Sequence, residues 1–341
     1  MRTRNRHRIP AVLAALAALL AGAACGGGAA GSGGAEVTEL RYQGWVGQVL
    51  LPELAADLGY LGKVKLTWIG NTISGPQDIQ SAATGQVEFG GAFNGAIVKL
   101  AAAKAPITAV VGYYGTDAKT YQGYYVTKDS PIRSARDLVG KKVGMNTLGA
   151  HAEAVLKTYL RRGRLGDADI DKVESIVVPP VNIEQSLRQG QIQVGVLGGL
   201  LRDKAVERGG LRPLFSDYDI FGTFTAGSYV FRDDFIKKNP GTVKEFVAGV
   251  AKAIEWVRSQ PPAAVTARYD AIIAKRGRSE DNSQTRYFRS LGVAGKGGLI
   301  TDAEFGNWIQ WLRDEGELSG DVRPAELYTN EFNPFADGGA A

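Results

Sequence analysis

The sequence predicts an α/β protein in which each of two lobes is a mainly parallel sheet flanked by helices. From residue 37 onward, short strand-like stretches alternate with amphipathic helical stretches, which is typical of parallel sheets covered by helices. A second set of such stretches begins near Lys128, and the chain after residue 240 is almost entirely helical. The two sets predict two lobes, and the C-terminal helices are expected to return to the first.

The first set of elements runs to residue 127. Residues 63–69 (KVKLTWI) alternate polar and apolar side chains, as a half-buried strand does, and residues 107–114 (ITAVVGYY) form an apolar run typical of a buried strand. Further strands are expected at 38–42, 87–91 and 121–127, and helices at 49–58, around Ile79 and at 94–103.

The second set predicts the other lobe. Residues 141–145 and 191–197 have the composition of strands, and 150–161 have an apolar face at helical spacing. A strand is also expected at 173–178, extended chain at 211–215 and 224–231, a single helical turn at 134–138, and helices at 183–189 and 200–207.

Capping patterns mark the C-terminal helices. Asn239-Pro240 places a capping residue and a proline at the start of a helix over 243–258. Pro261-Pro262 precedes a helix over 263–276. Thr301 and Glu304 form a capping box ahead of a helix whose tryptophans, Trp308 and Trp311, are expected to lie in the core.

The chain begins with a secretory signal. Residues 1–24 combine four arginines, an apolar run from residue 11 to 21 and small residues before Cys25. This run is shorter than the ~20 residues of a membrane-spanning helix. The pattern resembles a bacterial lipobox, with Gly22 where leucine, valine or isoleucine is more usual, and it implies lipidation of Cys25. The alternative is ordinary secretion with a free cysteine. Residues 25–36 (CGGGAAGSGGAE) are expected to be a flexible tether.

Composition excludes several classes of function. Four of the 40 Lys and Arg residues and none of the 35 acidic residues lie in the signal, so the remainder carries a formal charge of only +1. Such a chain gives no argument for nucleic-acid binding. His151 is the only histidine after the signal, which excludes multi-histidine zinc sites and HExxH motifs. The single cysteine excludes a disulfide within the chain. Serine–lysine and paired-carboxylate mechanisms are not excluded.

Candidate ligand-binding residues cluster in loops that join strands to helices. In open α/β sheets ligands bind beyond the carboxyl ends of strands, where helix N-termini supply N–H donors. Two residues near the predicted crossings between lobes could also reach a cleft, Tyr113 and Phe224. The alternative for the polar residues is local helix capping. The loop candidates are Trp45, Asn71, Thr72, Ser74, Asn94, Asn146, Thr147 and His151.

Five segments carry a family resemblance. DLVGKKVG at 137–144 and the FIKKNP segment at 235–240, followed by a helix that reaches Trp256, are the most specific. QDIQSAATGQVEFG at 77–90, Gly149-Ala150-His151 and EQSLRQGQIQV at 184–194 support them. Between about residues 38 and 316 the chain resembles the substrate-binding lipoproteins of ABC importers, in the nitrate/sulfonate/taurine and thiamine-precursor binding group. Gln193 departs from the family's usual aspartate, and Leu148 stands where many sulfonate binders have a hydroxyl residue.

The resemblance implies a two-lobe, periplasmic-binding-protein-like (type II) fold. Lobe 1 would comprise 37–117 and 223–341, and lobe 2 would comprise 118–222. Two hinge crossings would join them, near residues 115–122 and 221–226. A small oxyanion, most plausibly an aliphatic sulfonate, taurine or nitrate, would bind between the lobes and stabilise their closed arrangement. The partners would be the permease and ATPase subunits. The protein itself would lie at the extracytoplasmic face of the membrane, held there by its lipid anchor.

Three alternatives remain open from the sequence. A thiamine precursor or other heteroaromatic ligand would need an aromatic sandwich, for which Trp45, Phe93, Tyr113 and Tyr114 are available. An enzyme on the same scaffold would need a nucleophile–base pair, and none is evident near His151. A sensor domain would need a membrane partner. The resemblance implies no catalytic residues, no metal ion and no other cofactor.

Overall fold

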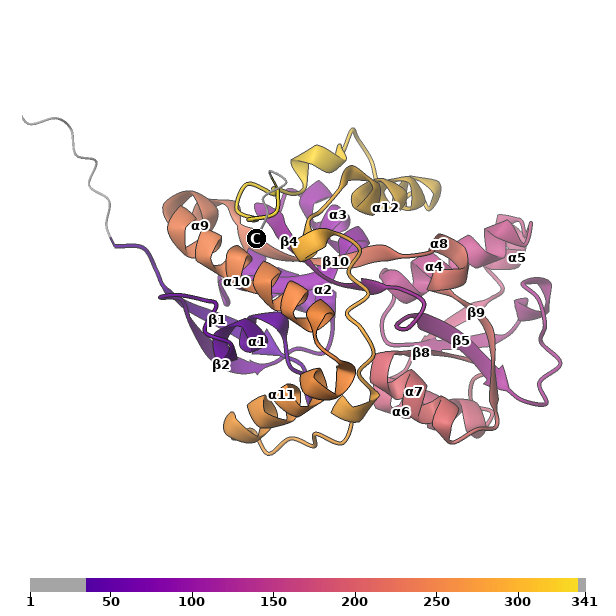
Figure 1. The fold of residues 1–341 in the computed structure, drawn as a ribbon. Helices are drawn as coiled ribbons and strands as arrows, with labels where there is room; N and C mark the ends of the chain where they lie inside the picture. Colours follow the sequence, from indigo (N-terminus) through magenta and orange to yellow (C-terminus); the bar gives the residue numbers. More distant parts are fainter. Residues whose placement is uncertain (1–34, 337–341) are drawn as a thin grey trace, which may run out of the picture. The chain divides into compact units, whose positions relative to one another are not determined.

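The computed structural model describes residues 35–336. The predicted signal peptide, Cys25 and all but the last two residues of the predicted tether lie outside the described residues. From Glu36 onward the chain forms one compact unit (Figure 1). Within residues 35–336, none of the helices combines the length and the apolar character that crossing a membrane requires.

Glu36 belongs to the folded body rather than to a tether. Its carboxylate accepts hydrogen bonds from the backbone N–H groups of Gly241 and Thr242, at 3.0 and 2.6 Å, at the start of helix α10 (Pro240–Ser259). Asn239 and Pro240 occupy the N-cap position and the first turn of α10, as predicted, but the Asn239 side chain makes no capping bond. It accepts from the Val37 N–H and donates to the Phe235 carbonyl instead. A residue 205 positions away therefore caps the helix.

Lobe 1 contains two small sheets. Strand β1 (Glu39–Gly44) pairs in parallel with β2 (Lys65–Asn71), and β10 (Phe224–Arg232) lies between β3 (Phe89–Phe93) and β4 (Ile107–Thr116), antiparallel to both. Its helices are α1 (Leu51–Asp57), α2 (Gly75–Ala83), α3 (Asn94–Ala102), α9 (Asp233–Lys238), α10, α11 (Pro262–Lys275) and α12 (Asp302–Asp314), with 3₁₀ turns at Thr285–Tyr287, Lys296–Gly298 and Pro324–Glu326.

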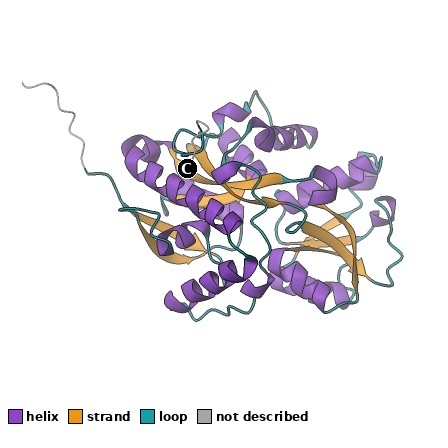
Figure 2. Ribbon diagram, viewed as in Figure 1, coloured by secondary structure: helices purple, strands orange, loops and turns teal. Residues whose placement is uncertain are grey.

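Lobe 2 contains a single five-stranded sheet in the order β7-β6-β8-β5-β9 (Figure 2). Its strands are β5 (Gln122–Thr127), β6 (Lys142–Met145), β7 (Glu174–Val177), β8 (Val194–Gly198) and β9 (Leu211–Ser216). The helices that cover it are α4 (His151–Arg162), α5 (Asp167–Ile170), α6 (Pro180–Arg188), α7 (Gly199–Glu207) and α8 (Asp217–Phe221), with a 3₁₀ turn at Arg136–Leu138.

Strand direction follows from the two crossings, at residues 117–121 and 222–223. In each lobe the first strand after a crossing, β5 or β10, is antiparallel to its neighbours. These strands begin at the boundary between the lobes, whereas the strands beside them end there. The other pairs, β1 with β2 and β6 with both β7 and β8, are parallel, as the alternation of strands and helices predicts. The three-stranded sheet of lobe 1 has antiparallel pairs only, so the sheets of the protein are mixed.

Each lobe has its own apolar core. In lobe 1, Phe246 of α10 contacts Phe89 of β3, with ring centroids 4.6 Å apart, and Trp308 and Trp311 of α12 are buried, as their spacing predicts. The capping box of Thr301 and Glu304 opens α12 as predicted. In lobe 2, Tyr124 on β5 is fully buried. Burial of these large side chains fixes both sheets and thereby the loops at their ends.

Candidate ligand-binding cavity

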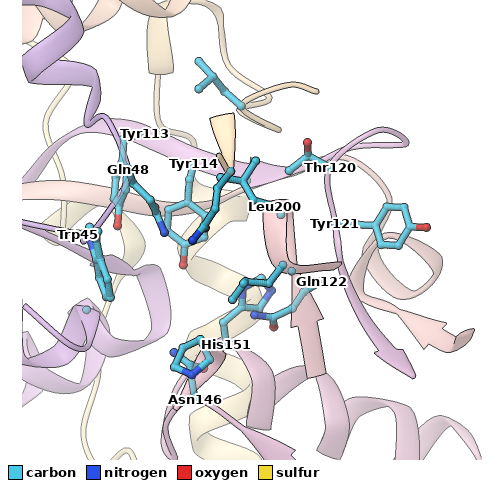
Figure 3. Close-up of a pocket in the computed structure, with 18 of the residues that line it drawn as sticks. Trp45, Gln48, Tyr113, Tyr114, Thr120, Tyr121, Gln122, Asn146, His151 and Leu200 are labelled. Atoms are coloured by element: carbon cyan, nitrogen blue, oxygen red, sulfur yellow. The ribbon is translucent and has the colours of Figure 1, made fainter. Parts of the chain in front are cut away.

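A cavity of about 500 Å³ lies between the two lobes. Its walls are built by loops at the carboxyl ends of strands, which is where ligands bind in open α/β sheets. Figure 3 shows Trp45, Tyr113 and Tyr114 on the side of lobe 1, and Asn146 and His151 on the side of lobe 2. Residues of both lobes therefore line the same cavity.

Aromatic rings form much of the lobe 1 wall. Tyr113 of β4 stacks on Tyr229 of β10, with ring centroids 4.1 Å apart and planes 20° from parallel. Tyr114 meets Tyr113 edge-on at 4.8 Å. Burial raises the pKa of both Tyr113 and Tyr114, so their phenols stay neutral. Trp45, in the loop after β1, completes an apolar and aromatic surface with hydroxyl groups at its edges.

Asp217 joins the two crossings at the base of the cavity. Its buried carboxylate accepts hydrogen bonds from the Thr116 hydroxyl at 2.7 Å and from the Gln122 N–H at 2.9 Å. The first of these residues ends β4 and the second begins β5, while Asp217 opens α8 just before the second crossing. Its Oδ2 also lies 3.2 Å from Nε2 of His151.

His151 connects the lobes by stacking. It opens α4 in lobe 2, and its ring lies parallel to that of Phe93 in lobe 1, with centroids 5.1 Å apart and planes 9° from parallel. Phe93 packs against the imidazole at the cavity wall, and Nε2 of His151 has no hydrogen-bond partner within residues 35–336, so it can exchange a hydrogen bond with a ligand.

Two helix N-termini also open on the cavity. The residues before α4 and α7 are Ala150 and Gly198, whose side chains cannot cap a helix. Both residues line the cavity. First-turn N–H groups of such helices are free to donate to a ligand, and the helix dipole places partial positive charge there.

Formal charge at the cavity wall is mixed. Asp203, Asp217 and Arg289 line it together with His151. Nε of Arg289 lies 3.8 Å from Oδ2 of Asp203, so the arginine is partly neutralised. Among residues 35–336, no group of His, Cys, Asp and Glu side chains is arranged to hold a metal ion.

The structure brings half of the predicted site residues together. Those that line the cavity are Trp45, Tyr113, Asn146, Thr147 and His151. They come from three segments that are distant in sequence: the loop after β1, the end of β4 and the connection between β6 and α4.

Five predicted residues lie elsewhere, and local bonds engage three of them. Asn71 ends the exposed strand β2 and accepts from the Trp68 indole at 3.3 Å. The Thr72 hydroxyl donates to the Ser74 carbonyl, and Ser74 caps α2. Ser74 thus has the local capping role that the sequence left as an alternative.

Asn94 and Phe224 lie behind the wall. The amide of Asn94 is fully buried, donates to the carbonyls of Thr225 and Glu304 and accepts from the Ser228 hydroxyl at 2.9 Å. Phe224 packs edge-on against His151 at 5.8 Å. Both residues support the site without lining it.

Several lining residues were not predicted from the sequence. Asp217 follows Ser216 in a short acidic stretch (SDYD) at the second crossing, which was a usable signal. The residues that follow α11 have no periodic pattern, and nothing in the sequence places them at the cavity. The unpredicted residues include Gln48, Tyr121, Gln122, Asp203, Asp217, Tyr229, Tyr269, Thr285 and residues 287–291.

Comparison with known proteins identifies the family. The family model described as "NMT1/THI5 like" matches residues 64–264, more than half of the chain. The chain belongs to the NMT1/THI5-like family. "Putative binding protein BAB2_1146" of Brucella abortus (strain 2308) is 24% identical over 265 residues, which are 76% of this chain and 79% of that protein.

Solved structures share the fold of this family member. The alkanesulfonate-binding protein SsuA from Xanthomonas axonopodis pv. citri, bound to MOPS, superposes with a TM-score of 0.68 at 18% identity, over 87% of this chain and 99% of that one. The periplasmic nitrate-binding protein NrtA from Synechocystis PCC 6803 has a TM-score of 0.66 at 13% identity, over 87% of each chain. The predicted periplasmic-binding-protein-like fold is thereby confirmed.

Proposed function

We propose that this protein is the solute-binding component of an ABC import system, which captures a small molecule between its lobes and presents it to permease and ATPase subunits. The observation that carries the proposal is the cavity between two lobes joined by two crossings, with walls from both. The binding proteins of known structure that share this fold support it. A ligand that contacts both lobes stabilises the arrangement in which they meet.

The cavity favours a ring-bearing organic ligand, such as a thiamine precursor or another aromatic heterocycle. A volume of about 500 Å³ is in the range of sites for organic ligands. Trp45, Phe93, Tyr113 and Tyr114, the residues that an aromatic sandwich would need, all line it. The carboxylate of Asp203, whose side chain is 14% exposed, suits a ligand with N–H or O–H donors.

A small oxyanion is the second candidate. The N-termini of α4 and α7, whose flanking residues cannot cap them, favour sulfonate, taurine or nitrate. The weak point of this candidate is charge, because Arg289 is paired with Asp203.

We propose binding rather than catalysis because, among the described residues, no nucleophilic hydroxyl is hydrogen-bonded to His151. Of the hydroxyl residues at the cavity, Thr120 donates to the Ser290 carbonyl, Ser290 to Asp117 and Thr285 to Asp270. Among the described residues, none of these hydroxyls donates to His151. Recovery of a chemically altered probe after incubation would contradict this part of the proposal.

Ligand class is tested by calorimetric titration and thermal unfolding of the purified protein. The probes are 4-amino-5-hydroxymethyl-2-methylpyrimidine, methanesulfonate, taurine and nitrate. A ligand at 100 times its Kd stabilises a protein by about 2.7 kcal/mol, so binding of the pyrimidine should raise the Tm clearly. A rise with the anions alone would replace the first candidate by the second, and no binding of any probe would remove both.

Trp45→Ala is the matched site variant. Loss of one stacked aromatic wall should weaken pyrimidine binding roughly tenfold. Trp68→Ala is the control, because Trp68 lies on β2 against the Arg278 guanidinium, 4.4 Å from its ring centroid, and outside the cavity. Equal loss of affinity in the two variants would contradict the placement of the ligand.

Lipidation of Cys25 belongs to the same proposal. Cys25 lies outside the described residues, and the argument for its acylation is the lipobox pattern alone. Mass spectrometry of the membrane fraction from a bacterial host should find a lipidated N-terminal cysteine, and Cys25→Ser should release the protein into the soluble extracytoplasmic fraction. An unmodified, soluble wild-type protein would contradict anchoring.

A further inference from the structure

A short segment after α11 contacts both lobes. We call residues 285–291 (TRYFRSL) the bridging segment. On the lobe 1 side, the Thr285 hydroxyl donates to Asp270 of α11 at 2.6 Å, and the Thr266 hydroxyl donates to the Thr285 carbonyl at 3.3 Å. These bonds attach the segment to α11.

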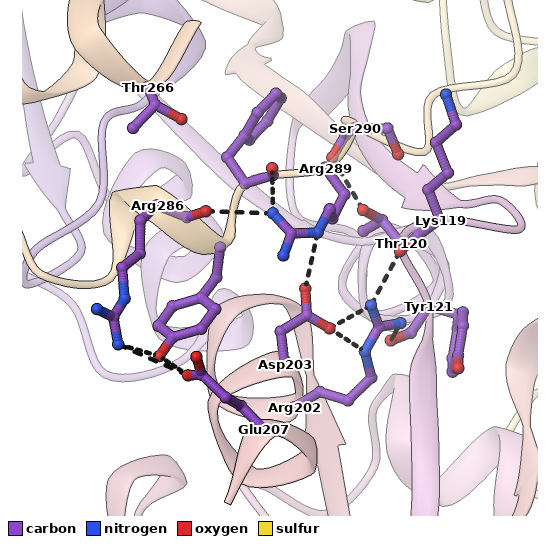
Figure 4. A network of polar contacts seen from close by, with 12 residues as sticks. Lys119, Thr120, Tyr121, Arg202, Asp203, Glu207, Thr266, Arg286, Arg289 and Ser290 are labelled. Atoms are coloured by element: carbon purple, nitrogen blue, oxygen red, sulfur yellow. Dashed lines mark hydrogen bonds and ion pairs between the residues drawn. The ribbon is translucent and has the colours of Figure 1, made fainter. Parts of the chain in front are cut away.

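The opposite side of the bridging segment contacts α7 of lobe 2 (Figure 4). Nε of Arg289 lies 3.8 Å from Oδ2 of Asp203. The Tyr287 hydroxyl donates to Glu207, and the guanidinium of Arg286 lies 3.6 Å from the same carboxylate. Residues 223–341 were expected to belong to lobe 1, so these contacts show the C-terminal part of the chain reaching lobe 2 as well.

The bridging segment is also fixed to the first crossing. The Ser290 hydroxyl donates to Asp117 at 2.7 Å, and the Thr120 hydroxyl donates to the Ser290 carbonyl at 3.1 Å. Beyond it, Gly292 has φ +66°, and a Cβ there would lie 2.3 Å from the backbone of Gly115, so only glycine allows this approach.

Asp203 extends the network into lobe 2. Arg202 donates to Asp203 at 2.7 Å and to the Lys119 carbonyl at 2.9 Å, and its guanidinium lies 3.9 Å from the centroid of the Tyr121 ring. Arg202 is only 5% exposed, so this part of the network is rigid. Arg289, by contrast, has a side chain that is 46% exposed, and Glu207 one that is 63% exposed.

We propose that the bridging segment is a latch between the lobes, and that Arg289 and Glu207 are positioning residues that set the ligand affinity of the cavity. The contacts of Arg289 and Glu207 can break one by one, because these side chains are exposed, while the attachments of the segment to α11 and to the first crossing persist. Since Tyr287 and Arg289 of the segment and Asp203 of α7 line the cavity, separation there opens the ligand site. The effect on affinity rests on the proposed binding function, but the effect on the ligand-free lobes does not.

Exposed ion pairs are individually weak, and the effect of the latch is correspondingly modest. Loss of both the Arg289–Asp203 pair and the contacts of Glu207 should shift the ratio of closed to separated lobes about threefold to tenfold. When the ligand binds only the closed form, its apparent affinity falls in proportion to the closed fraction.

The test measures lobe separation without ligand. Spin labels are placed at Lys128→Cys in lobe 2 and Lys244→Cys in lobe 1, two exposed positions, in a Cys25→Ser background. Double electron–electron resonance then gives the distance distribution. Arg289→Gln with Glu207→Ala should broaden it towards longer distances. Arg313→Gln is the control, because its 3.7 Å pair with Asp321 lies within lobe 1.

The outcomes separate the latch from the ligand assignment. An unchanged distribution in Arg289→Gln/Glu207→Ala, or an equal change in the control, would overturn the latch. A shifted distribution together with no binding of 4-amino-5-hydroxymethyl-2-methylpyrimidine would support the latch and contradict the ligand class. If the double variant fails to fold, Tyr287→Phe removes only one hydroxyl contact with Glu207 and should give a smaller shift in the same direction.

Discussion

Replacing Asp78 with asparagine is expected to change how the stability of this protein depends on pH. Asp78 lies in α2 and is only 5% exposed. Its Oδ2 accepts from the Gly91 N–H at 2.7 Å, whereas its Oδ1 has no hydrogen-bond partner in the described part of the chain. Burial raises the pKa of Asp78 from 3.8 to about 7, against a lowering effect of the Gly91 bond.

The magnitude follows from this shift in pKa. Each pKa unit is worth about 1.4 kcal/mol, so above pH 7 the buried charge lowers the free energy of unfolding by about 4 kcal/mol. Between pH 4 and 7 the folded state holds a proton that the unfolded state has lost, and stability therefore falls as the pH rises through this window. Below pH 4 both states are protonated and the effect vanishes.

Asp78→Asn keeps a carbonyl oxygen for the Gly91 N–H and removes the ionisation. As the pH rises from 5 to 7, the free energy of unfolding of the variant relative to that of the wild type should increase by about 2–3 kcal/mol. Urea denaturation at pH 5, 6, 7 and 8, followed by circular dichroism, measures this difference. The expected pattern is an advantage of the variant that grows from pH 5 to pH 7 and levels off by pH 8.

Asp137→Asn is the matched control. Asp137 is exposed, and hydrogen bonds from the Arg133 N–H and from Ser134 lower its pKa, so it stays ionised across the same range. Its difference from the wild type should be constant from pH 5 to 8. A difference for Asp78→Asn that is equally constant would refute the argument that burial keeps this carboxyl protonated.

Three further substitutions test other contacts. Glu36→Ala removes the distant cap of α10 and should cost about 1–2 kcal/mol in urea denaturation; an unchanged midpoint would show that the cap is dispensable. Asp217→Ala leaves the Gln122 N–H and the Thr116 hydroxyl without their acceptor and should cost about 3 kcal/mol at pH 7. Burial raises the pKa of Glu315, but hydrogen bonds from Lys157 and Arg161 outweigh it and lower the pKa. Glu315→Gln should therefore cost about 1 kcal/mol above pH 5, a difference that disappears as the pH falls towards 3; a cost that persists at pH 3 would contradict it.

Periodic segments were predictable from the sequence because their pattern reflects burial. The apolar run at 107–114 and the amphipathic stretch at 150–161 correspond to β4 and α4. Strand ends then placed Trp45 of lobe 1 and His151 of lobe 2 at one cavity, since β1 and β6 both end towards it. Direction was harder to predict, because nothing in the composition of β5 and β10 shows that they run antiparallel to their neighbours.

The sequence could predict only in part which residues line the cavity, because a polar residue before a helix can hydrogen-bond either to the backbone of that helix or to a ligand. Asn94 and Asn146 occupy similar positions in the sequence, yet the first is enclosed by Thr225 and Ser228 while the second lines the cavity. Contacts between segments decide this, and sequence patterns do not report them. For the same reason neither Asp217 nor the bridging segment was predicted.

The carboxylate of Asp217 constrains how the molecule can bend. Because it binds both the end of β4 and the start of β5 beside the second crossing, the two connections cannot flex separately, and rotation of one lobe against the other has its axis near this side chain. His151, 3.2 Å from the carboxylate, lies close to that axis and is displaced little by such a rotation. A ligand held against His151 thus keeps this contact while the two walls of the cavity open and close around it.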